Sequence, residues 1–239
     1  PGYSPNAIAE HAIALMMALN RKLVWANQRV HLGDFSLDGL VGFDMKSKTV
    51  GVVGTGRIGA CLVSILLGFG CQVLCYDVYK NPSLVDLANV QYVDLATLYQ
   101  QSDIISLHAP LMNTTYHMID QHAISQMKRG VMLINTSRGP LIDTQALIEG
   151  LKSGQVGSCG LDVVEGEQEY FYKDCSHGVI TNDQIAHLLS FQTRVMVTAH
   201  QAFLTNEALR EIASITLHNV IEYMQGKRMK QLSNSINQL

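Results

Sequence analysis

The sequence predicts an α/β fold in which a doubly wound parallel sheet carries helices on both faces. The first supporting observation is residues 49–77, where an apolar strand, a glycine-rich turn, a helix and a second apolar strand follow one another and end at Asp77. The second is that strand and helix patterns keep alternating along the rest of the chain, which indicates parallel strands with crossover helices. The third is size, because 239 residues with 47% apolar and 15% charged side chains can bury a sizeable core.

The elements are expected in the following order. Residues 5–30 should form one long helix, since Pro5 suits a first turn and apolar residues recur at helical spacing: Ile8, Leu15, Leu19 and Leu23. This helix is either buried between domains or a subunit contact, and its broad apolar surface fits both. Residues 33–47, which contain three glycines, should form a loop. The central unit then supplies a strand at 49–53, a helix at 58–69 and a strand at 71–76.

Beyond the central unit, helices are expected at 94–101, 120–128, 143–152 and 207–225. The third of these should be capped by Asp143 and closed by Gly154. Apolar, largely β-branched runs predict strands at 103–109, 131–136, 159–163 and 195–198. Residues 164–192 are acidic, aromatic and polar and should form a long loop or insertion, and the tail from Gly226 should be loose.

The glycine turn has the spacing of a dinucleotide-binding unit. Gly54, Gly56 and Gly59 follow the first strand as G-x-G-x-x-G, which allows a tight turn, a close approach to a pyrophosphate and close packing of the helix. Asp77 lies 77 − 54 = 23 residues after Gly54, near the roughly 20 expected for the acid that accepts from the adenosine ribose. This carboxylate favours NAD over NADP, although Lys80 is a nearby cation. The alternative is an ordinary turn between a strand and a helix.

Composition excludes several classes of partner. The net charge is −3 and there is no basic run, which excludes nucleic acid. No apolar stretch reaches the roughly 20 residues of a membrane helix. Five cysteines without a CxxC pair indicate reduced thiols in a cytoplasmic protein, and no cluster has the spacing of metal ligands. Because the chain begins with Pro1 and has no signal segment, it is expected to be part of a longer protein.

Polar residues just past the expected strands are the candidates for a reactive site. In doubly wound sheets ligands bind beyond the carboxyl ends of the strands, where Arg138, Asp162, Glu167 and His200 lie. His108 should line the same edge. The other histidines have no neighbours comparable to those of His200. Each candidate has an alternative interpretation: a solvated turn residue for Arg138, a solvated acidic loop for Glu167 and a core histidine for His200.

Three of these side chains together suit hydride transfer between a nicotinamide and an alcohol. An imidazole that titrates near neutral pH can exchange the hydroxyl proton. A guanidinium can hold a carboxylate and polarise the reacting group. A carboxylate beside the imidazole can fix its tautomer and stabilise the imidazolium. His200, Arg138 and Glu167 supply this set, whereas no G-x-S-x-G motif points to acyl chemistry.

Several linked stretches resemble the D-isomer-specific 2-hydroxyacid dehydrogenases, in order and over nearly the whole chain: 9–12 (AEHA), 50–59 (VGVVGTGRIG), 135–139 (NTSRG) and 161–167 (LDVVEGE). Residues 169–172 and 200–205 are most similar to the bacterial-type fermentative D-lactate dehydrogenases of that family. The resemblance implies a Rossmann-like fold and an NAD-dependent interconversion of a D-2-hydroxy acid and its 2-keto acid. D-lactate and pyruvate are the first pair to expect.

The resemblance also implies roles for individual residues. Arg138 would bind the substrate, His200 would be the acid/base, and Glu167 would pair with His200. Asp162 would hold the nicotinamide amide, and the backbone at Arg57 and Ile58 would meet the pyrophosphate. His108 and Thr136 would line the cofactor site together with the glycine turn and Asp77.

The resemblance further implies a division of the chain. Residues 1–30 would be a linking helix and possible contact of a homodimer, 31–204 the NAD-binding domain, and 205–239 a C-terminal helix of a smaller, incomplete substrate domain. Family members carry a further segment before this start, so poor activity is expected of the fragment. Three alternatives stay open: a dehydrogenase for a larger D-2-hydroxy acid, an inactive remnant, and a non-catalytic NAD-sensing protein similar to the corepressors of this family.

Overall fold

A computed structural model describes residues 4–228 and 231–234 of the chain. Within these residues, seven strands form one sheet in the order β3-β2-β1-β4-β5-β6-β7. Every pair of neighbouring strands is parallel, so the predicted doubly wound parallel sheet is confirmed. The strands are β1 (Thr49–Val53), β2 (Gln72–Tyr76), β3 (Val90–Tyr92), β4 (Ile104–Leu107), β5 (Val131–Asn135), β6 (Val156–Leu161) and β7 (Val195–Val197).

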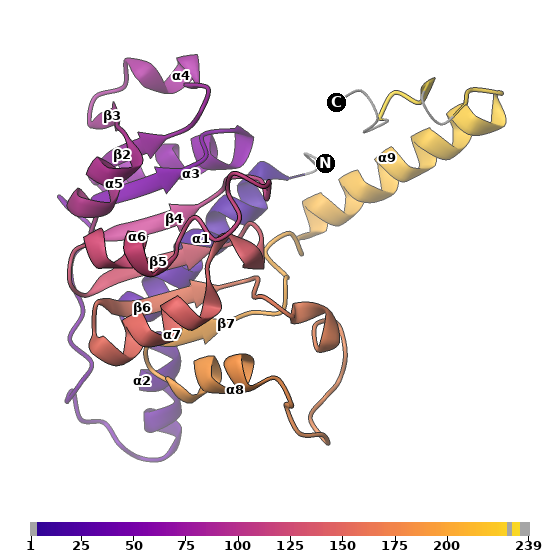
Figure 1. Cartoon of the computed structure of the whole chain (residues 1–239). Coiled ribbons are helices and arrows are strands. Elements are labelled where there is room, and N and C mark those ends of the chain that lie inside the picture. The colour runs from indigo at the N-terminus through magenta and orange to yellow at the C-terminus, as the bar shows by residue number, and fades with distance from the viewer. Residues whose placement is uncertain (1–3, 229–230, 235–239) are drawn as a thin grey trace.

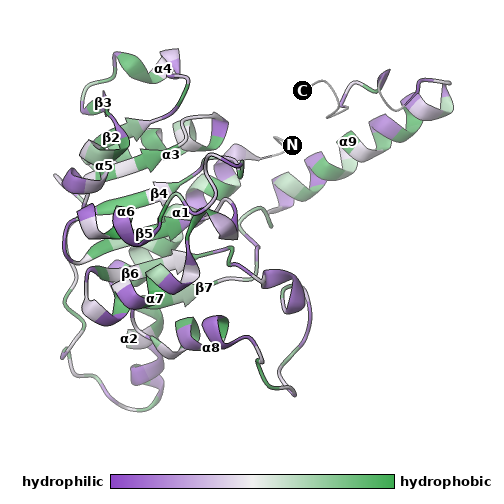
Figure 2. Ribbon diagram, viewed as in Figure 1, coloured by the Kyte–Doolittle hydropathy of each residue, from purple (hydrophilic) through white to green (hydrophobic). Residues whose placement is uncertain are grey.

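Two layers of helices cover the two faces of the sheet (Figure 1). One layer contains α1 (Pro5–Asn20) and α3 (Arg57–Gly68), and the other contains α5 (Leu95–Gln101), α6 (Gln121–Gln126), α7 (Thr144–Ser153) and α8 (Asp183–Ser190). Successive strand residues point to opposite faces, so Ile104 packs in the core beneath α1 and α3 while Ile105 packs in the other core. Figure 2 shows the resulting apolar strands between helices with mixed surfaces.

Helix caps agree with several of the predicted boundaries. Asp143 accepts from the backbone N–H groups of Gln145 and Ala146 at 2.9 and 3.1 Å, and Gly154 ends α7 with φ +75°. Asp94 and Asp120 likewise cap α5 and α6. The short α4 (Pro82–Val85) and β3 were not predicted, because each is too short for a periodic pattern.

The single helix predicted for residues 5–30 is wrong, because the structure divides it into α1 and α2 (Leu23–His31). Lys22 between them is left-handed, with φ 51°, and a right-handed helix cannot continue through that conformation. At the end of α1, the Asn20 amide donates to the Phe43 carbonyl and accepts from the Phe43 N–H, both at 2.8 Å. These two bonds fasten the predicted loop 33–47 to the point where α1 ends.

Two further boundaries differ from the prediction. Residues 164–192 are not one unbroken loop, since α8 lies within them, capped by Asn182 and with Ile185 and Leu188 buried. Although half of its eight residues are apolar, so short a run gives no clear helical period. Strand β6 begins at Val156, earlier than the predicted Cys159. Gly157 hides this start, because a β-carbon there would lie 2.5 Å from the Gly130 carbonyl oxygen and only glycine fits.

The last helix, α9 (Asn206–Met224), projects away from the body that the sheet forms (Figure 1). Its apolar side chains are largely exposed, including Leu217, Tyr223 and Met224. No helix in the described part of the chain is both long and apolar enough to cross a bilayer.

The predicted loose tail from Gly226 is wrong for its described part. The Ser233 N–H donates to Glu222 Oε2 at 2.7 Å, and Asn234 Nδ2 donates to Asn219 Oδ1 at 3.0 Å. Residues 231–234 therefore fold back onto α9. The rest of that prediction, at 229–230 and 235–239, lies outside the described residues, as do residues 1–3 at the predicted start of the linking helix.

Candidate functional site

The glycine turn joins β1 to α3 at the carboxyl edge of the sheet. Gly54 has φ +93°, and a β-carbon there would lie 2.6 Å from the Ala109 nitrogen. A β-carbon at Gly59 would lie 2.0 Å from the Gly54 carbonyl oxygen, so both positions require glycine. Gly56 differs, because no described atom lies within 4 Å of a β-carbon added there. This open space borders the N-terminus of α3, where helix geometry favours an anion.

Asp77 directly follows β2 and is hydrogen-bonded to the same turn. Its Oδ2 accepts from the Thr55 N–H at 2.6 Å and from Thr55 Oγ1 at 3.1 Å, and its Oδ1 accepts from the Tyr79 N–H at 3.1 Å. The Tyr92 hydroxyl donates to Thr55 Oγ1 at 2.8 Å and so completes a small network. An ionised carboxylate has about four acceptor positions, which leaves room for one more donor. The contact of Asp77 with a ribose hydroxyl stays a prediction.

Two buried polar side-chain atoms at this edge lack a hydrogen-bonding partner among the described residues: His108 Nδ1 and Thr136 Oγ1. Both residues follow neighbouring strands, β4 and β5, and both are predicted to bind the cofactor. His108 Nε2 shares a hydrogen bond of 2.8 Å with Ser106 Oγ, and burial lowers the pKa of the ring to about 4. Because unpaired buried polar atoms are costly, a ligand with amide and hydroxyl groups, such as a nicotinamide dinucleotide, fits this edge.

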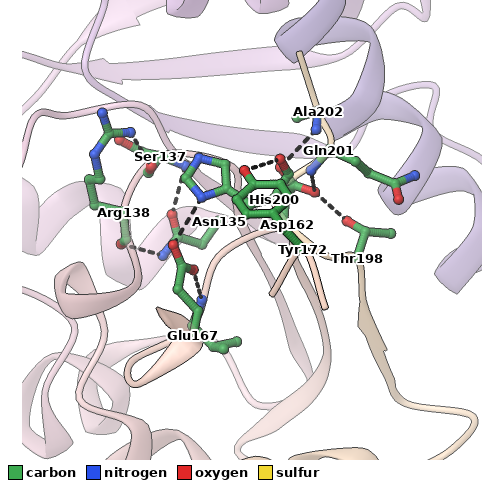
Figure 3. Close-up of polar contacts among 11 residues, drawn as sticks. Asn135, Ser137, Arg138, Asp162, Glu167, Tyr172, Thr198, His200, Gln201 and Ala202 are labelled. Carbon is green, nitrogen blue, oxygen red and sulfur yellow. Dashed lines mark hydrogen bonds and ion pairs between the residues drawn. The ribbon is translucent and has the colours of Figure 1, made fainter. Parts of the chain in front are cut away.

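The predicted imidazole–carboxylate contact is present. His200 Nδ1 and Glu167 Oε1 lie 2.9 Å apart (Figure 3). Glu167 Oε2 accepts from the Val164 N–H at 2.9 Å, which fixes the orientation of the carboxylate. When Nδ1 donates to Glu167, Nε2 is the nitrogen that can exchange a proton with a ligand. The imidazole side chain is 31% exposed, so a small molecule can reach it.

Asp162 holds the loop that carries His200. Its side chain is 1% exposed, and its carboxylate accepts from the N–H groups of Gln201 and Ala202 and from the Thr198 hydroxyl, at 2.9, 2.8 and 2.5 Å. The Asp162 carbonyl oxygen accepts from the His200 N–H at 2.8 Å. These bonds hold His200 in a left-handed conformation, with φ +53°. The predicted contact of Asp162 with a nicotinamide amide stays a prediction, and its observed contacts serve the loop.

Arg138 follows β5 on the same edge and is exposed. Its carbonyl oxygen accepts from Asn135 Nδ2 at 2.8 Å, and Asn135 Oδ1 accepts from the Ser137 N–H at 3.0 Å, so the backbone of this turn is fixed. Arg138 Nη1 donates to the Ser137 carbonyl oxygen at 2.7 Å. Four of the five guanidinium N–H groups remain for other acceptors. In the view of Figure 3, Arg138 and Thr198 stand on opposite sides of His200.

Two contacts of the His200 loop were not predicted. His11 of α1 places Nε2 at 3.0 Å from Thr198 Oγ1. The Tyr172 hydroxyl donates to the His200 carbonyl oxygen at 3.0 Å, and the two rings are tilted with centroids 6.2 Å apart. His11 and Tyr172 both lie in the stretches that carry the family resemblance, but nothing in their spacing indicated which loop they contact.

The remaining histidines were expected to have no neighbours comparable to those of His200. This expectation is wrong for His11, and it is also wrong for His117. The imidazole of His117 places Nε2 at 2.7 Å from Glu165 Oε1. From the sequence, Glu165 was expected only to be part of a solvated acidic loop. In the structure its side chain is only 22% exposed. Glu165 and Glu167, two residues apart, thus each contact a different histidine.

Comparison with known proteins gives a consistent result. Residues 13–202 match the NAD-binding domain of the D-isomer specific 2-hydroxyacid dehydrogenases. The D-lactate dehydrogenase of Escherichia coli (strain K12) is 49% identical over 227 residues, which cover 95% of this chain and 68% of the relative. The structure of the pyruvate reductase of Chlamydomonas reinhardtii superposes with a TM-score of 0.92 at 46% identity, over 98% of this chain and 70% of that one. D-lactate dehydrogenase from Aquifex aeolicus, complexed with NAD and lactic acid, gives 0.89 at 37% identity, over 98% of this chain and 71% of that one.

Proposed function

The chain belongs to the family of D-isomer specific 2-hydroxyacid dehydrogenases, and we propose that it is an NAD-dependent oxidoreductase that interconverts a D-2-hydroxy acid and its 2-oxo acid. The observation that carries the proposal is the 2.9 Å contact between His200 Nδ1 and Glu167 Oε1, at the sheet edge that also carries the glycine turn. An imidazole oriented by a carboxylate on one nitrogen is suited to exchange a proton through the other.

D-lactate and pyruvate are the proposed substrate pair. Support comes from the relatives, because the similar protein of Escherichia coli is a D-lactate dehydrogenase and that of Chlamydomonas reinhardtii is a pyruvate reductase. Arg138 is the proposed contact for the substrate carboxylate, since a guanidinium can bind two carboxylate oxygens with paired N–H groups. Its exposed position on the edge of the sheet suits a small anionic substrate.

In the direction of reduction, the residues have complementary roles. Arg138 binds the carboxylate and polarises the carbonyl group of the 2-oxo acid. NADH, when bound, supplies the hydride that the carbonyl carbon accepts. His200 gives the proton on Nε2 to the carbonyl oxygen, so that the 2-oxo acid gains one hydride and one proton and becomes the 2-hydroxy acid. Glu167 keeps the proton on Nδ1 and stabilises the cationic form of His200 from which that proton leaves.

The cofactor of the family domain is NAD. The N–H groups at Arg57 and Ile58 are proposed to meet the pyrophosphate beside Gly56, where the space is open. Asp77 is proposed to accept from the adenosine ribose, while His108 Nδ1 and Thr136 Oγ1 are proposed to pair with polar groups of the cofactor. Each assignment uses a donor or acceptor that has spare capacity among the described residues.

The proposal is tested with His200→Gln in the purified protein. This variant should lose at least about 100-fold in the rate of NADH-dependent pyruvate reduction, because the proton donor is removed. Binding of NADH, followed by its fluorescence, should stay within about twofold of wild type, since the glycine turn is unchanged. Turnover at the wild-type rate would overturn the assignment of His200. A panel of 2-oxo acids with larger side chains decides between pyruvate and a bulkier substrate.

We also propose a homodimer. The subunit contact was expected in the helix at residues 1–30, and the surface proposed here lies directly after that segment. The segment after α2 exposes large apolar side chains at Leu32, Phe35, Leu37 and Val41, which water-exposed loops rarely carry together. Sedimentation of the wild type and of Phe35→Asp tests this, because a charge in a dimer contact should shift the protein to the monomer. The division of the chain at residues 30 and 204 stays a prediction. The cytoplasmic location also stays a prediction, and it rests on the five free cysteines, which suit a reducing compartment.

A further inference from the structure

Glu165 has more hydrogen bonds than a solvated loop residue would. Its Oε1 lies 2.7 Å from His117 Nε2. Its Oε2 accepts from the Thr144 N–H at 3.1 Å and from the Thr144 hydroxyl at 2.7 Å. Thr144 is the first residue of α7, so the carboxylate also lies at a helix N-terminus, where negative charge is favoured. One side chain therefore joins the loop after β6 to two other segments.

Those two segments are also joined to each other beside Glu165. The His117 N–H donates to the Pro140 carbonyl oxygen at 2.8 Å, and His117 is left-handed with φ +50°. A β-carbon at Gly139 would lie 2.3 Å from the Val164 carbonyl carbon and 2.7 Å from the Glu165 nitrogen. The turn that carries Arg138 thus rests directly on the backbone that leads to Glu165.

The residues of the proposed reaction lie on either side of this junction. Arg138 precedes Gly139 on the turn between β5 and α7, and Thr144 begins α7 directly after that turn. Glu167 lies two residues after Glu165, on the same loop. The Glu167 carboxylate accepts a hydrogen bond from the N–H of Val164, the residue just before Glu165. His200 pairs with Glu167 (Figure 3). Any change in the spacing of the two loops would therefore change the distance from Arg138 to His200.

We propose that Glu165 is a positioning residue, which fixes the spacing between the substrate-binding Arg138 and the Glu167–His200 pair through its bonds to Thr144 and His117. This inference rests on the proposed function, because it takes the roles of Arg138 and His200 from there. Glu165 acts through the two loops and does not itself contact the reacting atoms. A displacement of about 1 Å between reacting groups costs roughly 100-fold in rate, so such a residue affects turnover strongly.

The test compares Glu165→Ala with Glu169→Ala. Glu169 lies on the same loop and is exposed, and its carboxylate has no hydrogen bond or ion pair among the described residues. Glu165→Ala should lower kcat/KM for the 2-oxo acid by roughly 10- to 100-fold, with NADH affinity within about twofold of wild type. Glu169→Ala should match wild type in both. Glu165→Gln, which retains an acceptor for the Thr144 N–H and hydroxyl, should recover activity to within about fivefold of wild type.

A second readout follows the imidazole of His200 and needs no turnover. The ¹⁵N NMR signals of His200 should report one tautomer in wild type and in Glu169→Ala, with the proton on Nδ1, because Glu167 selects it. In Glu165→Ala the signals should move toward the average of two tautomers. A purely structural role for Glu165 would change the melting temperature and leave the ratio of tautomers as it is.

The possible outcomes separate the two proposals. If Glu165→Ala matches Glu169→Ala in kcat/KM and in the His200 signals while His200→Gln is inactive, the positioning role is wrong and the proposed function stands. If His200→Gln keeps full turnover, the proposed function fails. If Glu165→Ala does not fold, His117→Asn decides, since asparagine tolerates the left-handed backbone but does not reach Glu165. An active His117→Asn with wild-type kcat/KM would overturn the positioning role.

Discussion

His11 of α1 and Thr198 after β7 share a hydrogen bond of 3.0 Å, although they are 187 positions apart in the chain. The Thr198 hydroxyl donates its one proton to Asp162 Oδ1 at 2.5 Å, so its oxygen accepts from His11, whose Nε2 carries the proton. Asp162 in turn accepts from the N–H groups that follow His200. The first helix is thereby connected to the loop of the proposed acid/base.

Thr198→Val is expected to weaken this connection without changing the size of the side chain. The Asp162 carboxylate is buried and would lose one of its three donors, which should lower the free energy of unfolding by about 1 to 3 kcal/mol. Urea unfolding measures the effect. Thr193→Val is the matched control, because Thr193 lies just before β7 with no side-chain hydrogen bond among the described residues. Equal stability of the two variants would contradict the role of the Thr198 hydroxyl.

The parts of this site that the sequence predicted are those in which local pattern and chemistry agree. Gly54 and Gly59 must be glycine for reasons that lie within a few residues of each, and the strands before Arg138 and His200 place these side chains on one edge of the sheet. The family resemblance added Glu167, because composition alone would have favoured a solvated surface position for this residue. Its contact with His200 agrees with that prediction.

The parts that the sequence did not predict depend on contacts between distant segments. The end of α1, just before the break at Lys22, is held by two hydrogen bonds between Asn20 and the distant Phe43. The partner of Glu165 is His117, on a different loop, and neither residue has a pattern around it that names the other. Pairings of this kind are set by how loops pack once the sheet has formed, and one sequence carries no record of them.

The glycine turn gives a prediction in which two similar substitutions affect different properties, one the stability and the other the NADH affinity. Gly59→Ala places a β-carbon against the Gly54 carbonyl oxygen, and this backbone clash should lower the free energy of unfolding by more than about 2 kcal/mol. Gly56→Ala meets no described atom within 4 Å, so its stability should stay within about 1 kcal/mol of wild type. The added methyl group enters the proposed pyrophosphate site, and NADH affinity should fall at least about tenfold. Thermal melts measure the stability of both variants, and NADH fluorescence measures their affinity for the cofactor. NADH binding by Gly56→Ala as tight as that of wild type would mean that the pyrophosphate does not lie beside Gly56.

Asp77 gives a prediction about the choice of cofactor. Asp77→Asn removes the charge that repels a 2′-phosphate, and its amide oxygen can still accept from the Thr55 N–H. NADH affinity should fall by about fivefold to tenfold, and the ratio of NADPH to NADH affinity should rise by at least about tenfold. Asp86→Asn, an exposed acid at the end of α4, is the control and should change neither value. A ratio equal to that of wild type would show that Asp77 does not select the cofactor.

The buried ring of His108 makes stability depend on pH. Burial lowers the pKa of this ring from 6.5 to about 4 in the folded protein. Between pH 6.5 and 4 the unfolded chain therefore binds a proton that the folded protein does not, so stability falls as the pH falls through this range and the loss is complete below pH 4. The two pKa values correspond to a loss of roughly 3 kcal/mol.

His108→Gln isolates this contribution, because glutamine does not titrate and its amide can still bond Ser106 Oγ. Wild type should lose about 2 to 3 kcal/mol more than this variant between pH 7 and pH 4, in urea unfolding without added NADH. Other titrating groups cancel in the difference. His122→Gln, at an exposed position of α6, should follow the wild-type curve. Parallel curves for wild type and His108→Gln would mean that the ring is protonated in the folded protein as readily as in the unfolded chain, and Nδ1 would then not be available as a neutral partner for the cofactor.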